Sequence, residues 1–336
     1  MSKKGIAAFV CACAVLFAAL FVFSSDQSDD PGKKVILKLG HVANLSQPYH
    51  LAAEKFAKDV LERTGGRVEI QVFPNSQLGG QRELLESLQL GTADMAMASS
   101  AVLGNFIPTA QVIDLPFIFR DSAHVYAVVD GPLADQIYAG AENKGMHILS
   151  TWENGFRNVG NNSRPVKTPA DMKGIKIRVF ESQLYIEMFE RLGAIPTPMA
   201  MGEVFTALQQ KTIDGIENAV VQIYASKYQE VMKYLSLTEH TYNPQIVIMS
   251  THKWNKLSQE NKNIILQAAK EARDFNRTLA AKKTGEYLDE MEKAGLQVTM
   301  LTAKEKEDFK KIMMPVWENY YGIVGKELID KVVATR

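Results

Sequence analysis

The sequence predicts an α/β protein of two lobes, joined by a hinge and spanned by one long helix. Three observations lead to this prediction. The chain has 336 residues, 46% of them hydrophobic and 23% charged, which is enough for two domains once a leader is removed. A strand, a helix and a second strand follow one another from residue 35, an order typical of a parallel sheet. A helical tract at residues 258–294 is far longer than an average helix, so it can brace both lobes.

The first residues have the pattern of an export signal. Two lysines, Lys3 and Lys4, precede an uncharged apolar run from Gly5 to Phe23, and a polar stretch follows. This pattern predicts a signal peptide over residues 1–24. The alternative is an uncleaved membrane anchor, because the run is just long enough for one span.

Cysteine content and charge narrow the class of protein. Both cysteines, Cys11 and Cys13, lie in the leader, so we expect a mature chain without disulfides, a thiol nucleophile or a thiolate metal site. Loss of the two leader lysines leaves 36 basic against 38 acidic residues. This near-neutral balance does not point to a nucleic-acid partner. An exported, cysteine-free chain of this size is typical of a bacterial periplasmic protein.

Hydrophobic periodicity predicts the elements of the first lobe. Alternation at Val35–Val42 and again at Val68–Val72 indicates two strands. Apolar residues at helical spacing lie between them and stop at Gly65-Gly66, a helix-ending signal. The other elements expected here are helices at 81–90, 122–129 and 133–143, strands at 93–99 and 146–152, and a buried connector at 114–119.

A sparse repeat links the two halves of the chain. Each copy has an acidic residue, a Leu-Gln pair, a threonine and an aspartate at the same spacing, and each describes a helix that leads into a strand. The copies are Glu83, Leu88-Gln89, Thr92 and Asp94, and Glu203, Leu208-Gln209, Thr212 and Asp214. The match is either chance or the mark of two similar lobes.

The second lobe and the hinge follow from the remaining pattern. We expect a strand at 173–179, a helix at 183–192, a β-rich run at 234–250 broken by Asn243-Pro244, and a helical C-terminus with a buried stripe at Met313, Val316, Trp317 and Tyr320. No linker rich in glycine, proline or serine separates the lobes, which favours hinge bending. We assign residues 34–154 plus 244–283 to lobe I and residues 155–243 plus 284–336 to lobe II.

Two arginines and an asparagine predict a carboxylate site. In the strand at 173–179, apolar side chains alternate with Lys176 and Arg178, and an arginine on a rigid strand can present its planar fork to a carboxylate. Arg157 follows a short segment that reads as a turn, and Asn218 ends a strand-like run. We predict that these three converge on a small carboxylate. For either arginine the alternative is a structural salt bridge.

Catalytic and cofactor motifs are missing from the sequence. The six histidines show no metal-ligand spacing, although His41 ends the first strand, where α/β folds place ligands. No Gly-x-Ser-x-Gly motif and no glycine-rich phosphate loop occurs, so we expect no metal and no organic cofactor. Asp214 and Glu217 are candidates for acid–base work in a secreted enzyme on acidic sugars. Their alternative role is to cap turns and pair with lysines.

Several motifs resemble one family over nearly the whole mature chain. They are LGHV, FPNSQLGGQRELLESLQLGTADM, DLPFIF, TPADMKGIKIRV, LGAIPTPMAMGEVFTALQQ, DGIEN and SKYQEV. In order and spacing they are similar to the solute-binding proteins of TRAP (tripartite ATP-independent periplasmic) transporters, the DctP-type family. The resemblance implies a two-lobed periplasmic binding protein fold that closes over one organic anion and delivers it to membrane subunits of the transporter. We expect the protein to be a monomer and to have no enzymatic activity.

The resemblance also assigns roles to individual residues. It implies that Arg178 forms the main bidentate salt bridge to the carboxylate, and that Arg157 and Asn218 add further contacts. Two positions differ from familiar members. Met201 stands where an aromatic residue is often found, and Phe180-Glu181 replaces the Pro-Asn of sialic-acid binders.

The remaining candidates concern ligand selectivity. Glu181 and Glu153, the latter beside Trp152, would repel a second ligand carboxylate and accept hydrogen bonds from sugar hydroxyls. These residues predict a hexuronate or aldonate as ligand, with a C4-dicarboxylate as the alternative. Ser99 and His41 complete the set of predicted ligand-binding residues.

Overall fold

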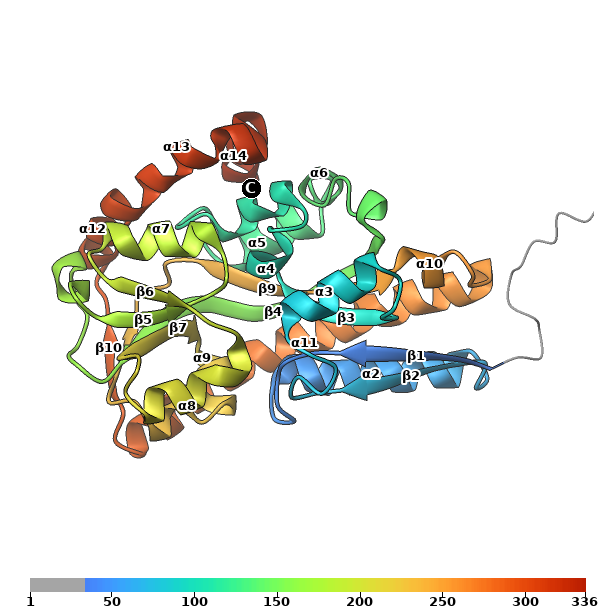
Figure 1. Cartoon of the computed structure of the whole chain (residues 1–336), viewed down its shortest axis with the longest axis horizontal. Helices are drawn as coiled ribbons and strands as arrows, with labels where there is room; N and C mark the ends of the chain where they lie inside the picture. The colour runs from blue at the N-terminus through green and yellow to red at the C-terminus, as the bar shows by residue number, and fades with distance from the viewer. Residues whose placement is uncertain (1–33) are drawn as a thin grey trace, which may run out of the picture.

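A single mixed sheet runs through the molecule. The computed structural model describes residues 34–336, so the predicted signal peptide and its two cysteines lie outside the described part. Within that part the strand order is β2-β1-β3-β9-β4-β7-β5-β6, and β8 joins the side of β4 and pairs with β10. In Figure 1 the sheet extends from β1 and β2 at one end to β5 and β6 at the other, flanked by helices.

The half of the molecule around β1 is the first lobe. Its elements are β1 (Val35–Gly40), α2 (Pro48–Arg63), β2 (Val68–Phe73), α3 (Gln81–Gln89), β3 (Met95–Ser99), α4 (Ser100–Leu103), α5 (Ser122–Val129), α6 (Ala134–Ile137) and α10 (Thr251–Trp254). The expected helix at 133–143 is wrong. Only α6 and a 3-10 turn at Glu142–Lys144 form, because Gly140 between them has a left-handed φ of 84°, which a continuous right-handed helix cannot contain.

The half around β5 is the second lobe. Its elements are β5 (Lys176–Val179), α7 (Gln183–Arg191), β6 (Ile195–Pro198), α8 (Val204–Gln209), β7 (Gly215–Ala219), α9 (Val220–Ala225), β8 (Tyr234–Leu237) and β10 (Gln297–Met300). The C-terminal helices are α12 (Ala303–Met313), α13 (Trp317–Tyr320) and α14 (Lys326–Ala334). The predicted stripe at Met313, Val316, Trp317 and Tyr320 is buried, as expected.

The sequence repeat is a repeat of structure. The series β1-α2-β2-α3-β3-α4 has the same order as β5-α7-β6-α8-β7-α9, and the strands pair as β2-β1-β3 and β6-β5-β7. The two repeated aspartates make the same contact. Asp94 Oδ2 accepts the backbone N–H of Lys38 at 3.0 Å, and Asp214 Oδ2 accepts that of Lys176 at 2.9 Å. Each therefore ties the first strand of its lobe to the third, so the repeat does not reflect chance.

Two long antiparallel strands connect the lobes. β4 (Met146–Asn161) pairs with β9 (Tyr242–Ser250) along the first lobe and with β7 and β8 in the second. The predicted turn before Arg157 is wrong, since β4 runs straight through it. Gly155, with a φ of 120°, follows a β-bulge that absorbs the irregularity without breaking the strand.

The predicted break at Asn243-Pro244 is also wrong. Pro244 remains within β9, and the interruption between β8 and β9 falls at residues 238–241 instead. Between Trp152 and Gly155 the register of β4 shifts against β9, opposite Pro244. A proline lacks the N–H that a regular ladder needs, so it is tolerated where a bulge already disturbs the pairing. The division of the chain at these crossing strands stays a prediction.

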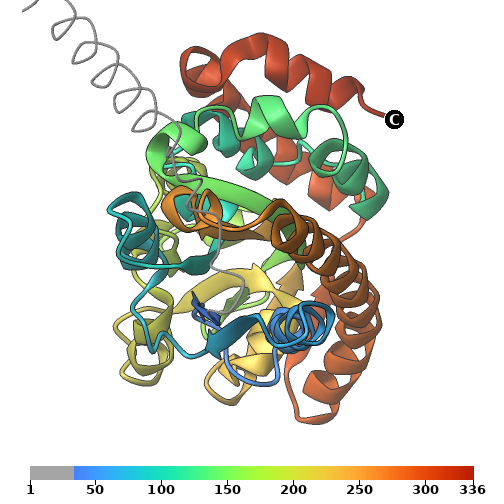
Figure 2. The ribbon, with the colours of Figure 1, turned by 90° about the vertical axis from the view of Figure 1, so that its right-hand side faces the viewer.

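Helix α11 (Gln259–Lys293) has 35 residues, as its long periodic tract predicts. The Ser258 side chain accepts a hydrogen bond from the N–H of Asn261 and caps its first turn. The helix packs on α2 and β4 in the first lobe and on α9 and β10 in the second, and Figure 2 shows it running alongside α2. Within residues 34–336, no helix combines the length and apolar character needed to cross a membrane.

Trp152 connects α11 to the core of the first lobe. Its side chain is fully buried, its Nε1 donates to the carbonyl of Ala269 in α11 at 3.2 Å, and its ring packs edge-on against Phe56. We expect Trp152→Ala to lower the free energy of unfolding by about 3–5 kcal/mol, since it leaves a large cavity. Urea denaturation measures the loss. The exposed aromatic Phe275 on the same helix provides the control, Phe275→Ala. A Trp152→Ala protein of unchanged stability would contradict the core role.

Candidate functional site

The three residues predicted to converge do lie together. Arg178 and Asn218 stand near the carboxyl ends of the parallel strands β5 and β7, where Arg178 is in register with Ile216. β4 lies on the other side of β7 and brings in Arg157. Because parallel strands end at the same edge of a sheet, the side chains at these ends share one region.

Arg157 makes an ion pair inside the protein. Its side chain is fully buried, and its Nε and Nη2 donate to the two carboxylate oxygens of Glu217 at 2.5 and 2.7 Å. The remaining nitrogen, Nη1, donates to Asn218 Oδ1 at 3.0 Å. The alternative interpretation, a structural salt bridge, therefore describes the contact with Glu217, while Nη1 contacts the amide oxygens of Asn218 and Asn243.

Glu217 is committed to the same pair. Burial raises the pKa of its carboxyl group, but the Arg157 guanidinium and the hydrogen bonds outweigh burial and hold the pKa below its usual range. His240 Nε2 lies 3.4 Å from the same carboxylate, and burial lowers the pKa of His240. The expectation that Glu217 caps a turn or pairs with a lysine is wrong, because its partner is an arginine.

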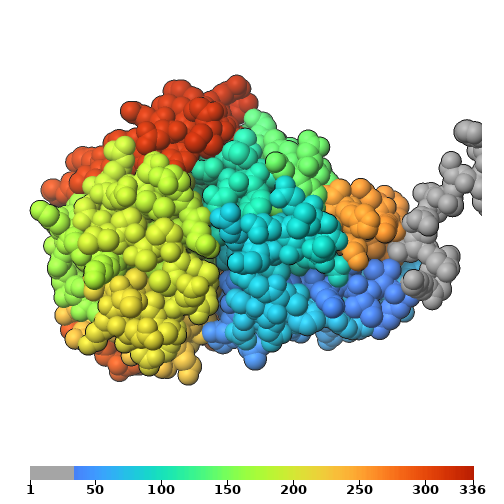
Figure 3. Space-filling view, viewed as in Figure 1, coloured from blue at the N-terminus to red at the C-terminus, as the bar shows by residue number. Residues whose placement is uncertain are grey.

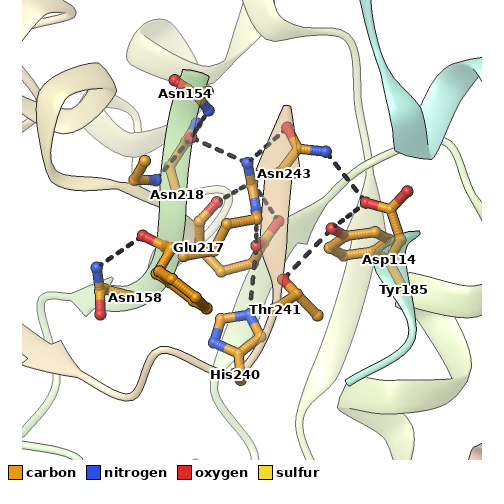
Figure 4. A network of polar contacts seen from close by, with 12 residues as sticks. Asp114, Asn154, Asn158, Tyr185, Glu217, Asn218, His240, Thr241 and Asn243 are labelled. Atoms are coloured by element: carbon orange, nitrogen blue, oxygen red, sulfur yellow. Dashed lines mark hydrogen bonds and ion pairs between the residues drawn. The ribbon is translucent and has the colours of Figure 1, made fainter. Parts of the chain in front are cut away.

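The pair belongs to a larger buried network, shown in Figure 4. Asn243 Nδ2 donates to Asp114 Oδ1 at 3.1 Å, and Tyr185 Oη donates to the same oxygen at 2.9 Å. Asn243 Oδ1 in turn lies 3.4 Å from Nη1 of Arg157. Burial raises the pKa of Asp114 to about 6. This network connects the site to Asp114 of the first lobe.

Arg178 differs from Arg157 because it lacks a counter-ion. Its side chain is 2% exposed, and its Nε and Nη2 donate to the carbonyl oxygen of Met199 at 2.9 and 2.6 Å. No carboxylate among residues 34–336 lies within the 4.0 Å ion-pair distance of its guanidinium. Burial lowers its pKa. A buried cation without an anion is costly, so this group is suited to receive one.

Phe180 connects the two arginines. The guanidinium carbon of Arg157 lies 4.3 Å from the centre of its ring, and that of Arg178 lies 5.0 Å away. Both distances are typical of cation–π contacts. Phe180, which stands where sialic-acid binders have a proline, therefore provides a ring that both cations contact.

Neutral amides from the first lobe and from β4 complete the site. Gln47 Nε2 donates to Asn154 Oδ1 at 3.2 Å, and Asn154 Nδ2 lies 3.5 Å from Asn218 Oδ1. All three amides are buried. Sequence reasoning missed Gln47 and Asn154 because a single amide in a loop or strand carries no motif, and nothing in the printed sequence marks either one.

Two further predicted residues, Trp152 and Glu153, lie on β4. Glu153 accepts hydrogen bonds from Tyr126 and Tyr242 at 2.7 and 2.6 Å, in a cavity lined also by Ala280 and Thr284 of α11. Burial raises the pKa of Glu153. Its neighbour Asn154 lines the same cavity, because both residues lie where the register of β4 shifts against β9. Trp152 belongs to the core, so its assignment as a ligand contact is corrected, whereas Glu153 remains a predicted ligand contact.

His41 and Ser99 are engaged within the first lobe. His41 Nδ1 accepts the backbone N–H of Ala43, and its Nε2 lies 3.1 Å from Nδ1 of His50. Burial lowers the pKa of His41 to about 3, with a smaller contribution from His50, so the ring is uncharged at neutral pH. Ser99 Oγ accepts the N–H of Val102 and caps α4.

Met201 and Glu181 lie in the second lobe. Met201 Sδ accepts a hydrogen bond from Tyr228 Oη at 3.6 Å. Glu181 is half-buried, and its backbone carbonyl accepts from Asn105 Nδ2 of the first lobe at 2.8 Å. Both remain predicted ligand contacts. Among residues 34–336, no three histidine, cysteine, aspartate or glutamate side chains are grouped to hold a metal ion.

The raised pKa of Asp114 predicts how stability depends on pH. A carboxyl group that holds its proton more tightly folded than unfolded makes the folded state less stable as pH rises through that interval. As the pH rises from 4 to 7, we expect the free energy of unfolding of the wild type to fall by about 2 kcal/mol relative to that of Asp114→Asn. Urea denaturation at both pH values measures it. The exposed Asp135 provides the control, Asp135→Asn, and an equal pH dependence in all three proteins would contradict the assignment.

Comparison with known proteins identifies the family of this chain. The family model described as bacterial extracellular solute-binding protein, family 7, matches residues 39–322. The 2,3-diketo-L-gulonate-binding periplasmic protein of Escherichia coli is 38% identical over 262 residues, which are 78% of this chain and 80% of that protein.

Two solved structures are also similar. One is a TRAP periplasmic solute-binding protein from a Polaromonas species bound to D-erythronate, with a TM-score of 0.87 and 37% identity, covering 90% of this chain and 99% of that one. The other is from Sulfurospirillum deleyianum with bound succinate, with a TM-score of 0.86 and 36% identity, covering 90% and 100%.

The two-lobed α/β fold is that of the periplasmic solute-binding proteins. The chain belongs to family 7 of the bacterial extracellular solute-binding proteins, the DctP family. It is a periplasmic solute receptor of a TRAP transporter.

Proposed function

We propose that this receptor binds a small hydroxylated monocarboxylate, such as a hexuronate or an aldonate, between its lobes. The observation that carries the proposal is Arg178, a cation that is 2% exposed and has no carboxylate within ion-pair distance in the described chain. The Nη1 nitrogen and the outward side of Nη2 are directed away from the Met199 carbonyl and are free to form a bidentate pair with one ligand carboxylate.

The neighbouring polar groups favour hydroxyls over a second carboxylate. Arg157 is neutralised by Glu217, and Asn218, Asn154 and Gln47 are neutral. Amides accept and donate hydrogen bonds to hydroxyls, whereas a second buried carboxylate would need another cation. The ligands of two relatives, D-erythronate and 2,3-diketo-L-gulonate, belong to the hydroxylated class.

A C4-dicarboxylate is the second candidate, because the similar protein from Sulfurospirillum deleyianum holds succinate. The negative charge of the half-buried Glu181 disfavours a second ligand carboxylate, since two like charges repel in a site of low dielectric constant.

We also propose that the protein has no enzymatic activity, acts as a monomer and hands its ligand to the membrane subunits of the transporter. Glu217 is held by Arg157, and Asp214 accepts the backbone N–H of Lys176. Because these contacts occupy both carboxylates, neither is available as a general base. Turnover of a uronate by the pure protein would overturn this part of the proposal.

Substitution of Arg178 tests the carboxylate contact. Breaking one side of a buried charged pair costs about 2–5 kcal/mol, so Arg178→Ala should weaken binding by at least a factor of about thirty. Arg178→Lys should fail as well, because an ammonium group cannot form two parallel hydrogen bonds. Calorimetry measures both. The exposed Arg191 in the same lobe provides the control, Arg191→Ala. A lysine variant that binds within a few-fold of the wild type would contradict the bidentate role.

A thermal-shift screen against organic acids tests the ligand class. A ligand present at about 100 times its dissociation constant adds about 2.7 kcal/mol of stability. We expect D-galacturonate, D-galactonate or D-erythronate to raise the melting temperature more than succinate, malate or fumarate does. Glu181→Gln should narrow this preference by removing a negative charge. Tight binding of succinate with no response to any sugar acid would reject the hydroxylated monocarboxylate.

A further inference from the structure

A cavity lies between the long helix α11 and β4, the strand that connects the lobes. It has a volume of about 230 Å³ and is lined by residues of α5, β4, β7, β8 and α11. Its lining includes neither Arg157 nor Arg178, so it is separate from the two arginines. In Figure 3 the lobes meet along a seam of yellow against blue and cyan surface, and the orange middle of α11 does not lie along that seam.

Glu153 is the buried charged group of this cavity. Its side chain is 7% exposed, and its Oε2 accepts hydrogen bonds from Tyr126 and Tyr242. Its Oε1 accepts none from residues 34–336, and it is not among the unpaired atoms that the protein encloses completely. A β-carbon at Gly155, which also lines the cavity, would stand 3.6 Å from Oε1. Because glycine has no side chain, the space beside this oxygen stays open.

No cation of the protein neutralises Glu153. No lysine, arginine or histidine of residues 34–336 lies within the 4.0 Å ion-pair distance of its carboxylate. Arg277 acts on it from further away but is paired with Asp130, and the other acidic residue of the lining, Glu239, is paired with Lys306. Burial raises the pKa of Glu153, and the tyrosine hydroxyls and Arg277 offset that rise only in part. A cation brought into the cavity would stabilise the ionised carboxylate.

The remaining walls suit a hydrocarbon chain. Five apolar side chains line the cavity: Phe156, Val220, Leu237, Ala280 and Leu288. The volume is that of roughly seven or eight water molecules in the liquid, which is enough for a short chain with one polar end. A hard metal ion would need several oxygen ligands, and residues 34–336 contain no group of three histidine, cysteine, aspartate or glutamate side chains that could hold one. The walls therefore favour an organic cation.

We propose that this cavity is a second binding site, which takes a small primary ammonium ion with a short hydrocarbon chain. The ammonium group pairs with Glu153 Oε1, and the chain lies against Phe156 and Leu237. In this assignment the ligand that Glu153 contacts is the cation and not the organic acid. The second site goes beyond the proposed receptor function and does not rest on the class of acid that the arginines bind.

Ala281 marks the opening of the cavity. It lines the cavity and is exposed, whereas the preceding residue, Ala280, lines it and is buried. A larger side chain at position 281 therefore narrows the entry without entering the core. Leucine is a good helix former, so Ala281→Leu is compatible with α11.

Calorimetry on the full chain tests the second site with n-butylamine as the probe. An alkylamine of this kind is protonated at neutral pH. n-Butanol provides the same hydrocarbon chain without the charge, and potassium chloride provides a cation without the chain. We expect the n-butylammonium ion to bind at one site per chain, and the other two to give no saturable heat at the same concentrations.

Three variants locate the binding. Glu153→Gln keeps the shape of the side chain and removes its charge, so the affinity for n-butylammonium should fall at least about tenfold. Ala281→Leu should weaken binding as well, because it narrows the entry. Glu292→Gln is the matched control, because Glu292 is an exposed carboxylate on the same helix and its loss changes the net charge equally.

Equal affinity of the wild type and Glu153→Gln would overturn the second site. Equal binding of n-butanol or potassium would do so too, as would an equal loss in Glu292→Gln, since that would indicate a general effect of charge. Circular dichroism reports whether each variant folds. If Glu153→Gln does not fold, Ala281→Leu decides the question, and unchanged n-butylammonium binding in that variant would reject the site.

A measurement with an organic acid separates the second site from the proposed function. D-Galactonate should bind equally to the wild type and Ala281→Leu, and saturating D-galactonate should leave n-butylammonium able to bind. Mutual exclusion of the two ligands would make the cavity part of the organic-acid site and overturn the second site. Failure of the wild type to bind any sugar acid would reject the proposed ligand class, while the n-butylamine data would still decide the second site.

Discussion

Two guanidinium groups are buried against one phenylalanine ring, and only one of them has a carboxylate partner. Glu217 neutralises Arg157 through two hydrogen bonds, whereas Arg178 has only the carbonyl oxygen of Met199. A buried charge without a counter-ion is tolerated when binding of an anion compensates for it. The proposed selectivity of the site for anions follows from this imbalance, because Arg178 is a buried cation with no carboxylate within ion-pair distance in the described chain.

The repeated architecture explains where this imbalance lies. Each lobe places its first and third parallel strands side by side, tied by Asp94 in one lobe and Asp214 in the other. Their carboxyl ends form the edge where the chain leaves the sheet and backbone groups are open to a ligand. The first lobe ends β1 with Gly40, and the second has Arg178 at the matching register position of β5. The lobes are alike in framework and different in charge.

The contribution of the first lobe is neutral. Gln47 and Asn154 bring amides to the seam, and His41 is uncharged because burial lowers its pKa to about 3. This division explains how one site can combine strong attraction for a carboxylate with selectivity for the rest of the ligand. The second lobe supplies the charge. The amides of the seam supply directional hydrogen bonds.

The sequence by itself determined the features that depend on local pattern. The cap and length of α11, the repeat and the side of β5 that carries Arg178 were all predicted from residues close together in the chain. Only the tertiary structure decided the partners. Arg157 and Glu217 are 60 positions apart, and Gln47 and Gln222 are 175 apart. It also decided the partners of Glu153, the hydroxyls of Tyr126 and Tyr242, because β4 is covered on both faces and alternation in such a strand does not mark which face a ligand meets.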